Sequence, residues 1–166
     1  MRVVTRVVVL ILLAAFGFWI WRTFFPSSEV VIQKRLVKLA RDASFSASDN
    51  ELSKAAGALA VPDFFAPRVD IVLDLPGGVR HTFNNRDDIA DKARSSRLGP
   101  GLSVSFPDIN VSVNPGGVSA VADVTLNAHI AGDHDDIVEE LQITLEKTNS
   151  DWLISRIQTV RPVSLQ

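Results

Sequence analysis

The feature that most constrains the fold is an alternation of apolar and polar residues with a period of two, which runs through the stretch Leu102–Val163. Over positions 118–130 all even residues are apolar, and five of the six odd residues are polar. The pattern resumes over 137–146, after the turn Gly132–Asp135. Because successive side chains of a strand point to opposite faces, this pattern predicts antiparallel strands half-buried against another layer.

Turn residues divide the stretch into four long strands. Gly99-Pro100-Gly101 precedes the first strand and Asn114–Gly117 the second, while Asn149–Asp151 introduces the last one, from Trp152 to about Val163. Within the first strand the apolar residues move from even to odd positions near Pro107. A one-residue change of register beside proline predicts a bulge or bend.

Two helices are predicted ahead of the strands. The first begins after Ser28, and its apolar residues recur at helical spacing at Ile32, Leu36, Leu39, Ala40 and Ala43. Its basic residues form either a solvated face or a contact with lipid headgroups; they are Lys34, Arg35, Lys38 and Arg41.

A capping box formed by Ser48 and Glu51 predicts that the second helix runs from Asp49 to about Val61. Its apolar stripe consists of Leu52, Ala55, Ala56 and Leu59.

A hairpin and a third helix are predicted between the second helix and the four strands. The hairpin pairs Val69–Leu75 with Val79–Phe83 through the turn Pro76-Gly77-Gly78. Asn85 can cap the third helix, which carries Ile89, Ala90 and Ala93 and ends before Gly99. The whole order predicts an α+β fold, in which helices cover one face of an antiparallel sheet.

The N-terminal residues 1–25 differ from the rest, and we assign residues 26–166 to the folded domain. Positions 7–21 read VVVLILLAAFGFWIW, without a charge. With flanking arginines reaching toward the headgroups, residues 3–25 are long enough for a membrane-spanning helix. A cleaved signal peptide and a buried core helix are the alternatives, but the tract ends in bulky residues that suit no cleavage site.

The charges on either side of this tract predict its orientation. Arg2 and Arg6 precede it, and positive residues favour the cytoplasmic side. We therefore expect a single-pass protein of a bacterial inner (cytoplasmic) membrane, with a cytoplasmic N-terminus and a periplasmic or extracellular domain.

Composition argues against several functions. Past the anchor, which holds three of the 17 basic residues, 14 basic residues face 19 acidic ones, so no basic footprint for nucleic acid is expected. Cysteine is absent, which excludes disulfides, thiolate metal sites and thiol catalysis. Tyrosine is absent as well, which removes one common general acid.

The order of elements, with three local motifs, resembles the nuclear transport factor two-like (SnoaL-like) superfamily. The motifs are Phe64-Phe65-Ala66-Pro67 before a strand, Asn85–Ile89 at a helix start, and Asp151–Ile157 in the closing strand. The resemblance covers about Val30–Val163. It implies a cone-shaped, cystatin-like α+β domain whose bent sheet wraps the helices and can leave a pocket.

The resemblance leaves the function open. It implies isomerases, cyclases and dehydratases, but also binding and assembly modules without chemistry, among them a membrane-tethered periplasmic component of type IV secretion machines. Many SnoaL-like enzymes carry an acidic residue where this chain has Arg68, which argues against a transferred active site. Asp70 and His81 are weak catalytic candidates, and the alternation predicts that Asp70 and Asp74 face away from the helices. The aromatic residues expected in the core or along a pocket are Phe64, Phe65, Phe83, Phe106 and Trp152.

No cofactor or metal site is predicted. Asp133-His134-Asp135-Asp136 contains suitable ligand types, but turns favour aspartate for backbone reasons and the sequence shows no second ligand cluster.

The leading hypothesis is a membrane-anchored, extracytoplasmic module that has no catalytic activity. It would bind itself or an envelope protein through the polar face of the long strands, where Glu140, Gln142 and Thr144 could be buried. The alternative is a small-molecule binder, or an isomerase, cyclase or dehydratase, that uses the cone pocket.

Overall fold

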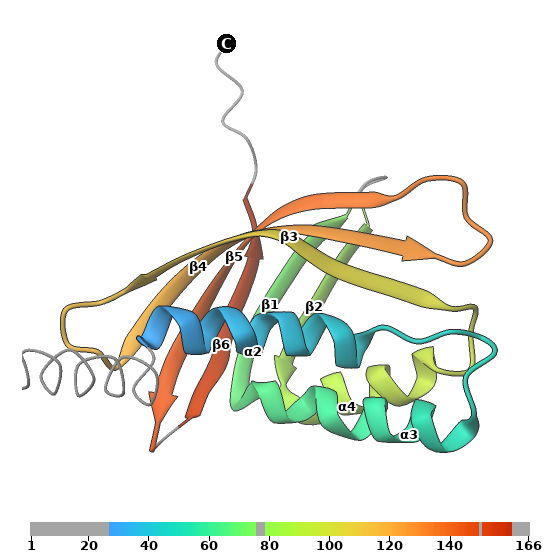
Figure 1. Ribbon diagram of the computed structural model, residues 1–166, viewed down its shortest axis with the longest axis horizontal. Coiled ribbons are helices and arrows are strands. Elements are labelled where there is room, and N and C mark those ends of the chain that lie inside the picture. Colours follow the sequence, from blue (N-terminus) through green and yellow to red (C-terminus); the bar gives the residue numbers. More distant parts are fainter. Residues whose placement is uncertain (1–26, 76–78, 150, 161–166) are drawn as a thin grey trace, which may run out of the picture.

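A computed structural model describes residues 27–75, 79–149 and 151–160, and it confirms the predicted order of elements (Figure 1). Helices α2, α3 and α4 lie on one side of a single six-stranded sheet. The elements in chain order are α2 (Ser28–Ala43), α3 (Glu51–Ala60), the 3-10 turn η1 (Val61–Phe64), β1 (Phe65–Leu75), β2 (Val79–Asn85), α4 (Arg86–Ser96), β3 (Leu102–Val113), β4 (Ser119–Ile130), β5 (Ile137–Thr148) and β6 (Asp151–Thr159).

The sheet has the strand order β2-β1-β6-β5-β4-β3. All neighbours are antiparallel except β1 and β6, which run parallel, so the purely antiparallel prediction is wrong at this one pair. The predicted bulge beside Pro107 is confirmed, because the β3–β4 register shifts between Ser105 and Asp108. Further register shifts interrupt β1 between Arg68 and Ile71 and the β5–β6 pair at Thr144/Leu145.

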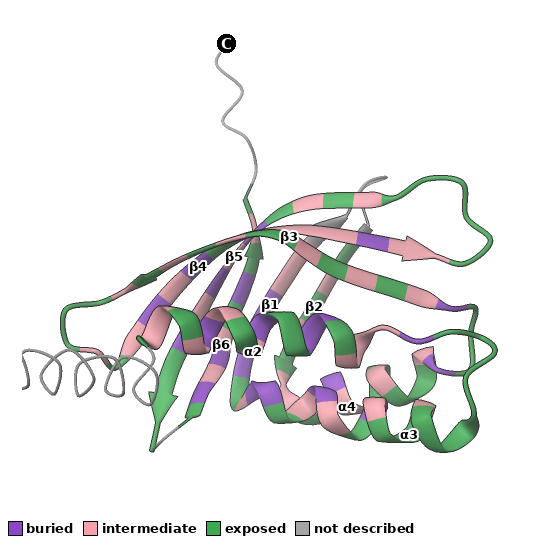
Figure 2. Ribbon diagram, in the orientation of Figure 1, coloured by how far each residue is buried: buried purple, intermediate pink, exposed green. Residues whose placement is uncertain are grey.

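The core lies between α2 and the inner face of the sheet. Leu36 on α2 and Ile143 on β5 are fully buried, and buried positions alternate with less buried ones along β4 and β5 (Figure 2). Burying a leucine or isoleucine side chain contributes about 1.5–3 kcal/mol. The inner-face residues of the three central strands are Ala120, Ala122, Val124, Leu141, Leu145, Trp152, Ile154 and Ile157.

The helix caps agree in part with the prediction. Asn85 caps α4 as expected, since its side chain accepts a hydrogen bond of 2.8 Å from the backbone N–H of Asp88. The predicted start of the second helix is wrong: α3 begins at Glu51, and Asn50 accepts the capping bond from Ser53 N–H at 2.7 Å. Ser48 instead lies in the preceding turn, where its hydroxyl contacts that of Ser46 at 2.9 Å.

The apolar stripe predicted for the second helix is exposed. Leu52 is 81% exposed and Leu59 is 67% exposed, and Ala55 and Ala56 are exposed as well. The helix buries its opposite side, with Ala58 only 3% exposed. The physical reason is that α3 packs mainly on α2, α4 and η1, while α2 and α4 make the main helix contacts with the sheet.

A buried arginine holds the three helices together. Arg97 is 7% exposed; its Nη1 donates a 3.0 Å hydrogen bond to the carbonyl of Ser44, and its Nη2 donates to the carbonyl of Asp42. Its guanidinium carbon lies 4.6 Å from the centre of the Phe45 ring. A Cβ at Gly57 would lie 3.0 Å from Nη2, so glycine in mid-helix makes room for this cation. Burial lowers the pKa of Arg97, although Asp42 and Asp49 act in the opposite direction.

The predicted membrane anchor at 3–25 lies outside the described residues, as do positions 161–163 of the predicted last strand; β6 ends at Thr159. Within the described ranges no helix has the length and apolar character needed to cross a membrane.

Candidate functional site

The concave side of the sheet holds an apolar cavity of about 350 Å³. It lies between α2, α4 and the sheet, and its walls include residues of β1, β2, β3 and β6. The lining residues are Leu39, Ala40, Ala43, Phe65, Ile71, Leu73, Phe83, Ile89, Lys92, Ala93, Ser96, Leu102, Val104, Phe106 and Ile157.

This cavity has few polar lining residues. Lys92 and Ser96, both on α4, are its two polar lining residues, and the Ser96 hydroxyl donates a 3.0 Å hydrogen bond to the carbonyl of Ala93. The described lining residues include no carboxylate and no histidine. Acid–base catalysis needs such a group within hydrogen-bond reach of the substrate. Predominantly apolar linings of this kind are typical of small-molecule binding pockets.

Three of the five predicted pocket aromatics line the cavity: Phe65, Phe83 and Phe106. The other two are core residues with cations above their rings. Phe64 is 4% exposed, and the charged groups of Arg35 and Lys38 lie 5.1 and 5.0 Å from its ring centre. Trp152 is 2% exposed, with Lys147 Nζ 5.8 Å from its ring centre.

The structure separates the two weak catalytic candidates. Asp70 lies on the outer face, as predicted, where its Oδ2 accepts hydrogen bonds of 3.1 and 2.7 Å from Nε and Nη2 of Arg156. His81 pairs with Leu73 across the β1–β2 hairpin and stacks on Phe83, so it belongs to the inner face beside the cavity. Two residues on opposite faces of a sheet cannot act on one substrate. The structure does not describe the side chain of Asp74.

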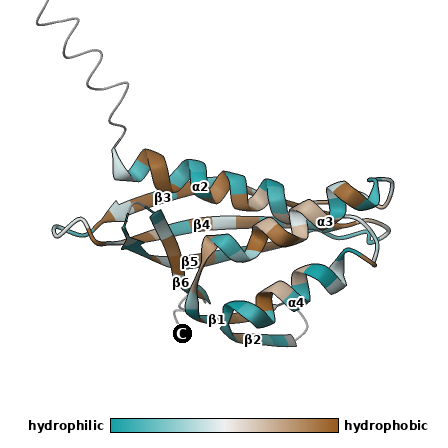
Figure 3. Cartoon of the chain, turned by 90° about the horizontal axis from the view of Figure 1, so that it is seen from below, coloured by the Kyte–Doolittle hydropathy of each residue, from teal (hydrophilic) through white to brown (hydrophobic). Residues whose placement is uncertain are grey.

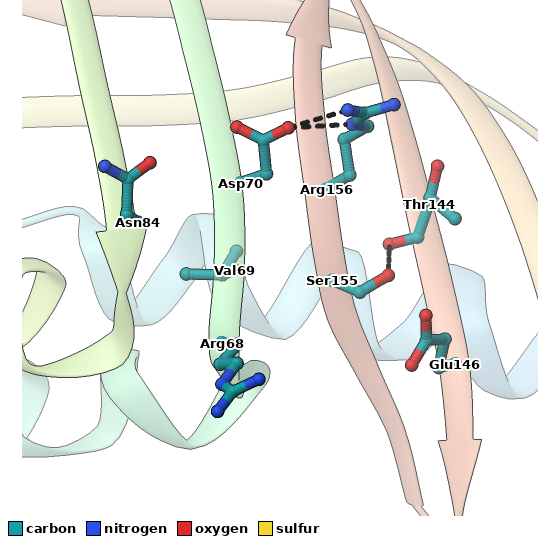
Figure 4. Close-up of a pocket in the computed structure, with 8 residues that line it drawn as sticks. All are labelled: Arg68, Val69, Asp70, Asn84, Thr144, Glu146, Ser155 and Arg156. Atoms are coloured by element: carbon teal, nitrogen blue, oxygen red, sulfur yellow. Dashed lines mark hydrogen bonds and ion pairs between the residues drawn. The ribbon is translucent and has the colours of Figure 1, made fainter.

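A second hollow, of about 630 Å³, lies on the outer face over β1, β2, β5 and β6 (Figure 4). It sits where the β1 and β5–β6 registers shift, and bulges re-aim side chains at such places. Arg68 and Glu146 are exposed at its rim, with the Asp70–Arg156 pair between them and the centre of the sheet. The lining residues are Arg68, Val69, Asp70, Asn84, Thr144, Glu146, Ser155 and Arg156.

Polar side chains continue from this hollow across the sheet in two bonded groups, which we together call the outer ladder: the pair Asp70–Arg156, and the row Asp123, Gln142 and Gln158. Gln158 donates to Gln142 at 3.0 Å, and Gln142 donates to Asp123 at 3.1 Å. Exposed ion pairs contribute only about 0–1 kcal/mol to folding. The ladder therefore orders a surface more than it stabilises the domain.

The residues expected at an interface lie on or beside the ladder. Gln142 is part of it, Glu140 accepts a 2.8 Å hydrogen bond from Thr125, and the side chain of Thr144 lines the outer hollow. Sequence alternation placed these residues on the outer face, but it gave no sign of the two bonded groups or of the hollow, because these depend on strand order and on bulges.

The aspartate-rich turn holds no metal-binding cluster. The Nδ1 atom of His129 lies 2.7 Å from Asp136 Oδ1, and the intervening residues Asp133–Asp135 are exposed. In the part of the chain that the structure describes, no three His, Asp or Glu residues gather closely enough to hold a metal ion.

No protein-family model matches the chain, and no curated protein matches it in sequence. Solved structures match it in fold. An NTF2-like protein of unknown function from Pseudomonas putida KT2440 has a TM-score of 0.60 at 9% identity, over 84% of this chain and 89% of that one. A provisionally assigned scytalone dehydratase from Novosphingobium aromaticivorans has a TM-score of 0.52 at 14% identity, over 80% and 86%. A chain of the yeast complex of the deubiquitinase Ubp3 and the Bre5 cofactor has a TM-score of 0.57 at 12% identity, over 82% and 99%.

These matches show that the chain has an NTF2-like fold, as the sequence predicted. At such low identities they show the fold alone, because one fold serves both enzymes and binding modules.

Proposed function

We propose that this protein is a membrane-tethered, non-catalytic module that binds a protein partner or a second copy of itself through the outer face of its sheet. The observation that carries the proposal is the outer ladder together with the hollow beside it. A polar surface whose side chains already hold one another loses less conformational entropy when a partner binds. Charges of both signs around the hollow, from Arg68 to Glu146, provide specificity for a complementary face.

The cavity supports the non-catalytic part of the proposal. Its described lining brings together no acid–base pair, and the candidates Asp70 and His81 lie on opposite faces of the sheet. The same fold occurs in a chain of a yeast complex between an enzyme and its cofactor. That likeness adds only that the fold is compatible with an assembly role.

The proposed membrane tether is inferred from the sequence alone. The uncharged tract 7–21, bounded by Arg2 and Arg6, favours a retained anchor with the domain outside the cytoplasm. A reporter that is active only outside the cytoplasm, fused to Gln166, should be active. An inactive reporter would contradict the orientation, and a mature chain that begins after Trp21 would contradict the anchor.

Cross-linking tests the interface. The chain has no cysteine, so Gln158→Cys provides a single thiol on the outer ladder, and Ser95→Cys on the exposed side of α4 provides its control. In membranes that hold the full chain, a maleimide that carries a photoreactive benzophenone should, on irradiation, give a cross-linked adduct from Gln158→Cys and none from Ser95→Cys. A doubled mass identifies a second copy, and any other mass identifies a partner.

A further change separates binding from folding. Arg156→Glu should abolish the adduct, because it reverses a charge of the ladder, while the exposed Asp70–Arg156 pair is worth only about 0–1 kcal/mol of folding free energy. If Gln158→Cys is fully labelled by the benzophenone maleimide but forms no adduct on irradiation, the outer face is uncovered and the proposal is contradicted.

The apolar cavity supports a second candidate function, the binding of an apolar small molecule. Its volume of about 350 Å³ lies at the small end of the range for ligand pockets, roughly 300–1,000 Å³. Ala93→Phe would fill this space from α4, whereas Ser95→Phe places a phenyl group on the exposed side of the same helix. Binding of a hydrophobic dye should fall at least roughly tenfold in Ala93→Phe alone, which corresponds to about 1.4 kcal/mol. Equal dye binding in both variants would exclude the cavity as the binding site.

A further inference from the structure

The exposed large apolar side chains gather on the helical side of the molecule. Of the eight in the described residues, four lie on α2 and α3 and a fifth, Leu98, follows α4. Figure 3 views this side and shows apolar and polar bands side by side on α2 and α3. A cluster of exposed apolar residues on one face marks an interaction surface, whereas scattered single residues need no explanation.

On α3 the apolar residues form one continuous stripe. Leu52, Ala55, Ala56 and Leu59 follow the 3, 1 and 3 spacing of a single helix face, and all four are exposed. Lys54 is the one charged residue within this span, and its side chain is only 13% exposed, on the side that faces the hollow between α3 and α4. The outward face of α3 is therefore uncharged between its two leucines.

The outward face of α2 combines apolar and cationic residues. Val30, Lys34, Val37 and Arg41 follow one another at spacings of 4, 3 and 4, and all four are exposed. Long cationic side chains beside apolar ones are typical of helices that lie at the level of lipid headgroups, because the alkyl part is buried and the charge reaches a phosphate.

The position of the apolar tract connects this surface with a bilayer. Residues 1–26 precede α2 directly, and α2 begins at Ser28. If the tract at 7–21 is inserted, a few residues separate its end from Val30. The outward faces of α2 and α3 are then held within reach of the lipid surface by the chain itself.

We propose that the outward faces of α2 and α3 lie on the surface of the bilayer that holds the tether. Leu52, Leu59 and Val37 enter the headgroup region, and Lys34 and Arg41 bind lipid phosphates. This inference rests on the proposed tether. Charge complementarity favours lipid, because Lys34 and Arg41 are cations and a second copy of the α2 face would carry the same positive charges. Phosphate groups complement the same cations.

Single cysteines test the contact in the full chain, which has none of its own. Leu52→Cys and Leu59→Cys carry a polarity-sensitive fluorophore on the stripe; Asn110→Cys, exposed on β3, is the control. The chain is reconstituted into vesicles of phosphatidylethanolamine and phosphatidylglycerol, with nitroxide lipids as quenchers. Quenching at 52 and 59 should exceed that at 110 by roughly threefold or more, because an interfacial helix buries its apolar face 5–10 Å deep. The double substitution Lys34→Glu and Arg41→Glu should reduce the quenching at positions 52 and 59.

Flotation of the same vesicles separates the two proposals. A chain that does not float with the lipid refutes the tether. A chain that floats but is quenched equally at 52, 59 and 110 leaves the tether intact and overturns the contact. Disulfide-linked dimers of unlabelled Leu52→Cys, without quenching of the labelled form, would assign the stripe to a second copy and also overturn the inference.

Discussion

Helices α2 and α3 have similar amphipathic sequences, yet they use their apolar faces in opposite ways. In α2 the apolar residues Ile32 and Leu36 are fully buried against the sheet. In α3 the corresponding stripe, with Leu52 and Leu59, faces away from the protein, and Ala58 takes the buried side. Periodicity shows that a helix has an apolar face; it does not show which surface covers that face.

The difference arises from the order in which the helices cover the sheet. α2 packs along β3 and α4 contacts the β1–β2 hairpin, so these two helices occupy the positions next to the sheet and α3 packs on them. α3 packs on the other two helices through small residues, with Gly57 placed against the buried guanidinium of Arg97. Its leucines therefore have no place in the core.

The largest expected effect separates the two stripes directly. Leu36→Ala should lower the free energy of unfolding by about 3 kcal/mol, since it removes a fully buried side chain and leaves a cavity. Leu52→Ala should change it by less than about 0.5 kcal/mol, because the side chain is already exposed. Urea unfolding of the full chain in detergent, followed by circular dichroism, measures both. Similar losses would show that the α3 stripe is covered within the protein.

The next effect concerns the cation between the helices. Arg97→Met should lower the free energy of unfolding by about 2 kcal/mol, because the carbonyls of Asp42 and Ser44 lose charged donors in a partly buried site. Arg94→Met is the control, since its pair with Asp91 is exposed and worth less than about 1 kcal/mol. If both variants lose the same amount in urea unfolding, Arg97 does not hold α2 and α3 together.

The caps give a smaller contrast. Asn50→Ala removes the side-chain acceptor at the start of α3 and should cost about 1 kcal/mol. Ser27 precedes α2 and makes no capping bond to the helix backbone, so Ser27→Ala should have a much smaller effect on the free energy of unfolding. Thermal unfolding of both variants measures which substitution destabilises the protein more. A larger loss of stability in Ser27→Ala than in Asn50→Ala would contradict the prediction.

Sequence reasoning was most reliable where each strand has one apolar and one polar face. It placed the four long strands, the bulge at Pro107 and the outward position of Asp70, because these follow from local period and turn chemistry. It was wrong about the cap at Ser48 and about the pairing of β1 with β6, which depend on tertiary contacts.

The candidate sites were predicted less well than the fold. The five aromatics lie in the core or along the cavity, as expected, but strand alternation alone could not tell that Phe64 and Trp152 lie in the core while the other three line the cavity. Arg97 was missed because a lone arginine after a helix resembles any surface cation. Gly57 is the sequence feature that could have indicated the buried arginine. Glycine within a helix lowers stability by about 1 kcal/mol, so its presence there points to close packing against another group.

The smallest expected effect concerns the first turn of α2, which uses a carboxylate where α3 uses an asparagine cap. A hydrogen bond from the backbone N–H of Glu29 lowers the pKa of its carboxyl group, and a further bond from Ser27 adds to this. A lowered pKa in the folded state stabilises the fold above the ordinary value of 4.5, and this contribution is lost as the pH falls through the folded pKa. Ser27→Ala should move the pKa of Glu29 upward, part of the way to 4.5, because the backbone bond remains. An NMR titration of the Glu29 side-chain carboxyl carbon measures the shift; an unchanged pKa would show that Ser27 takes no part in the first turn.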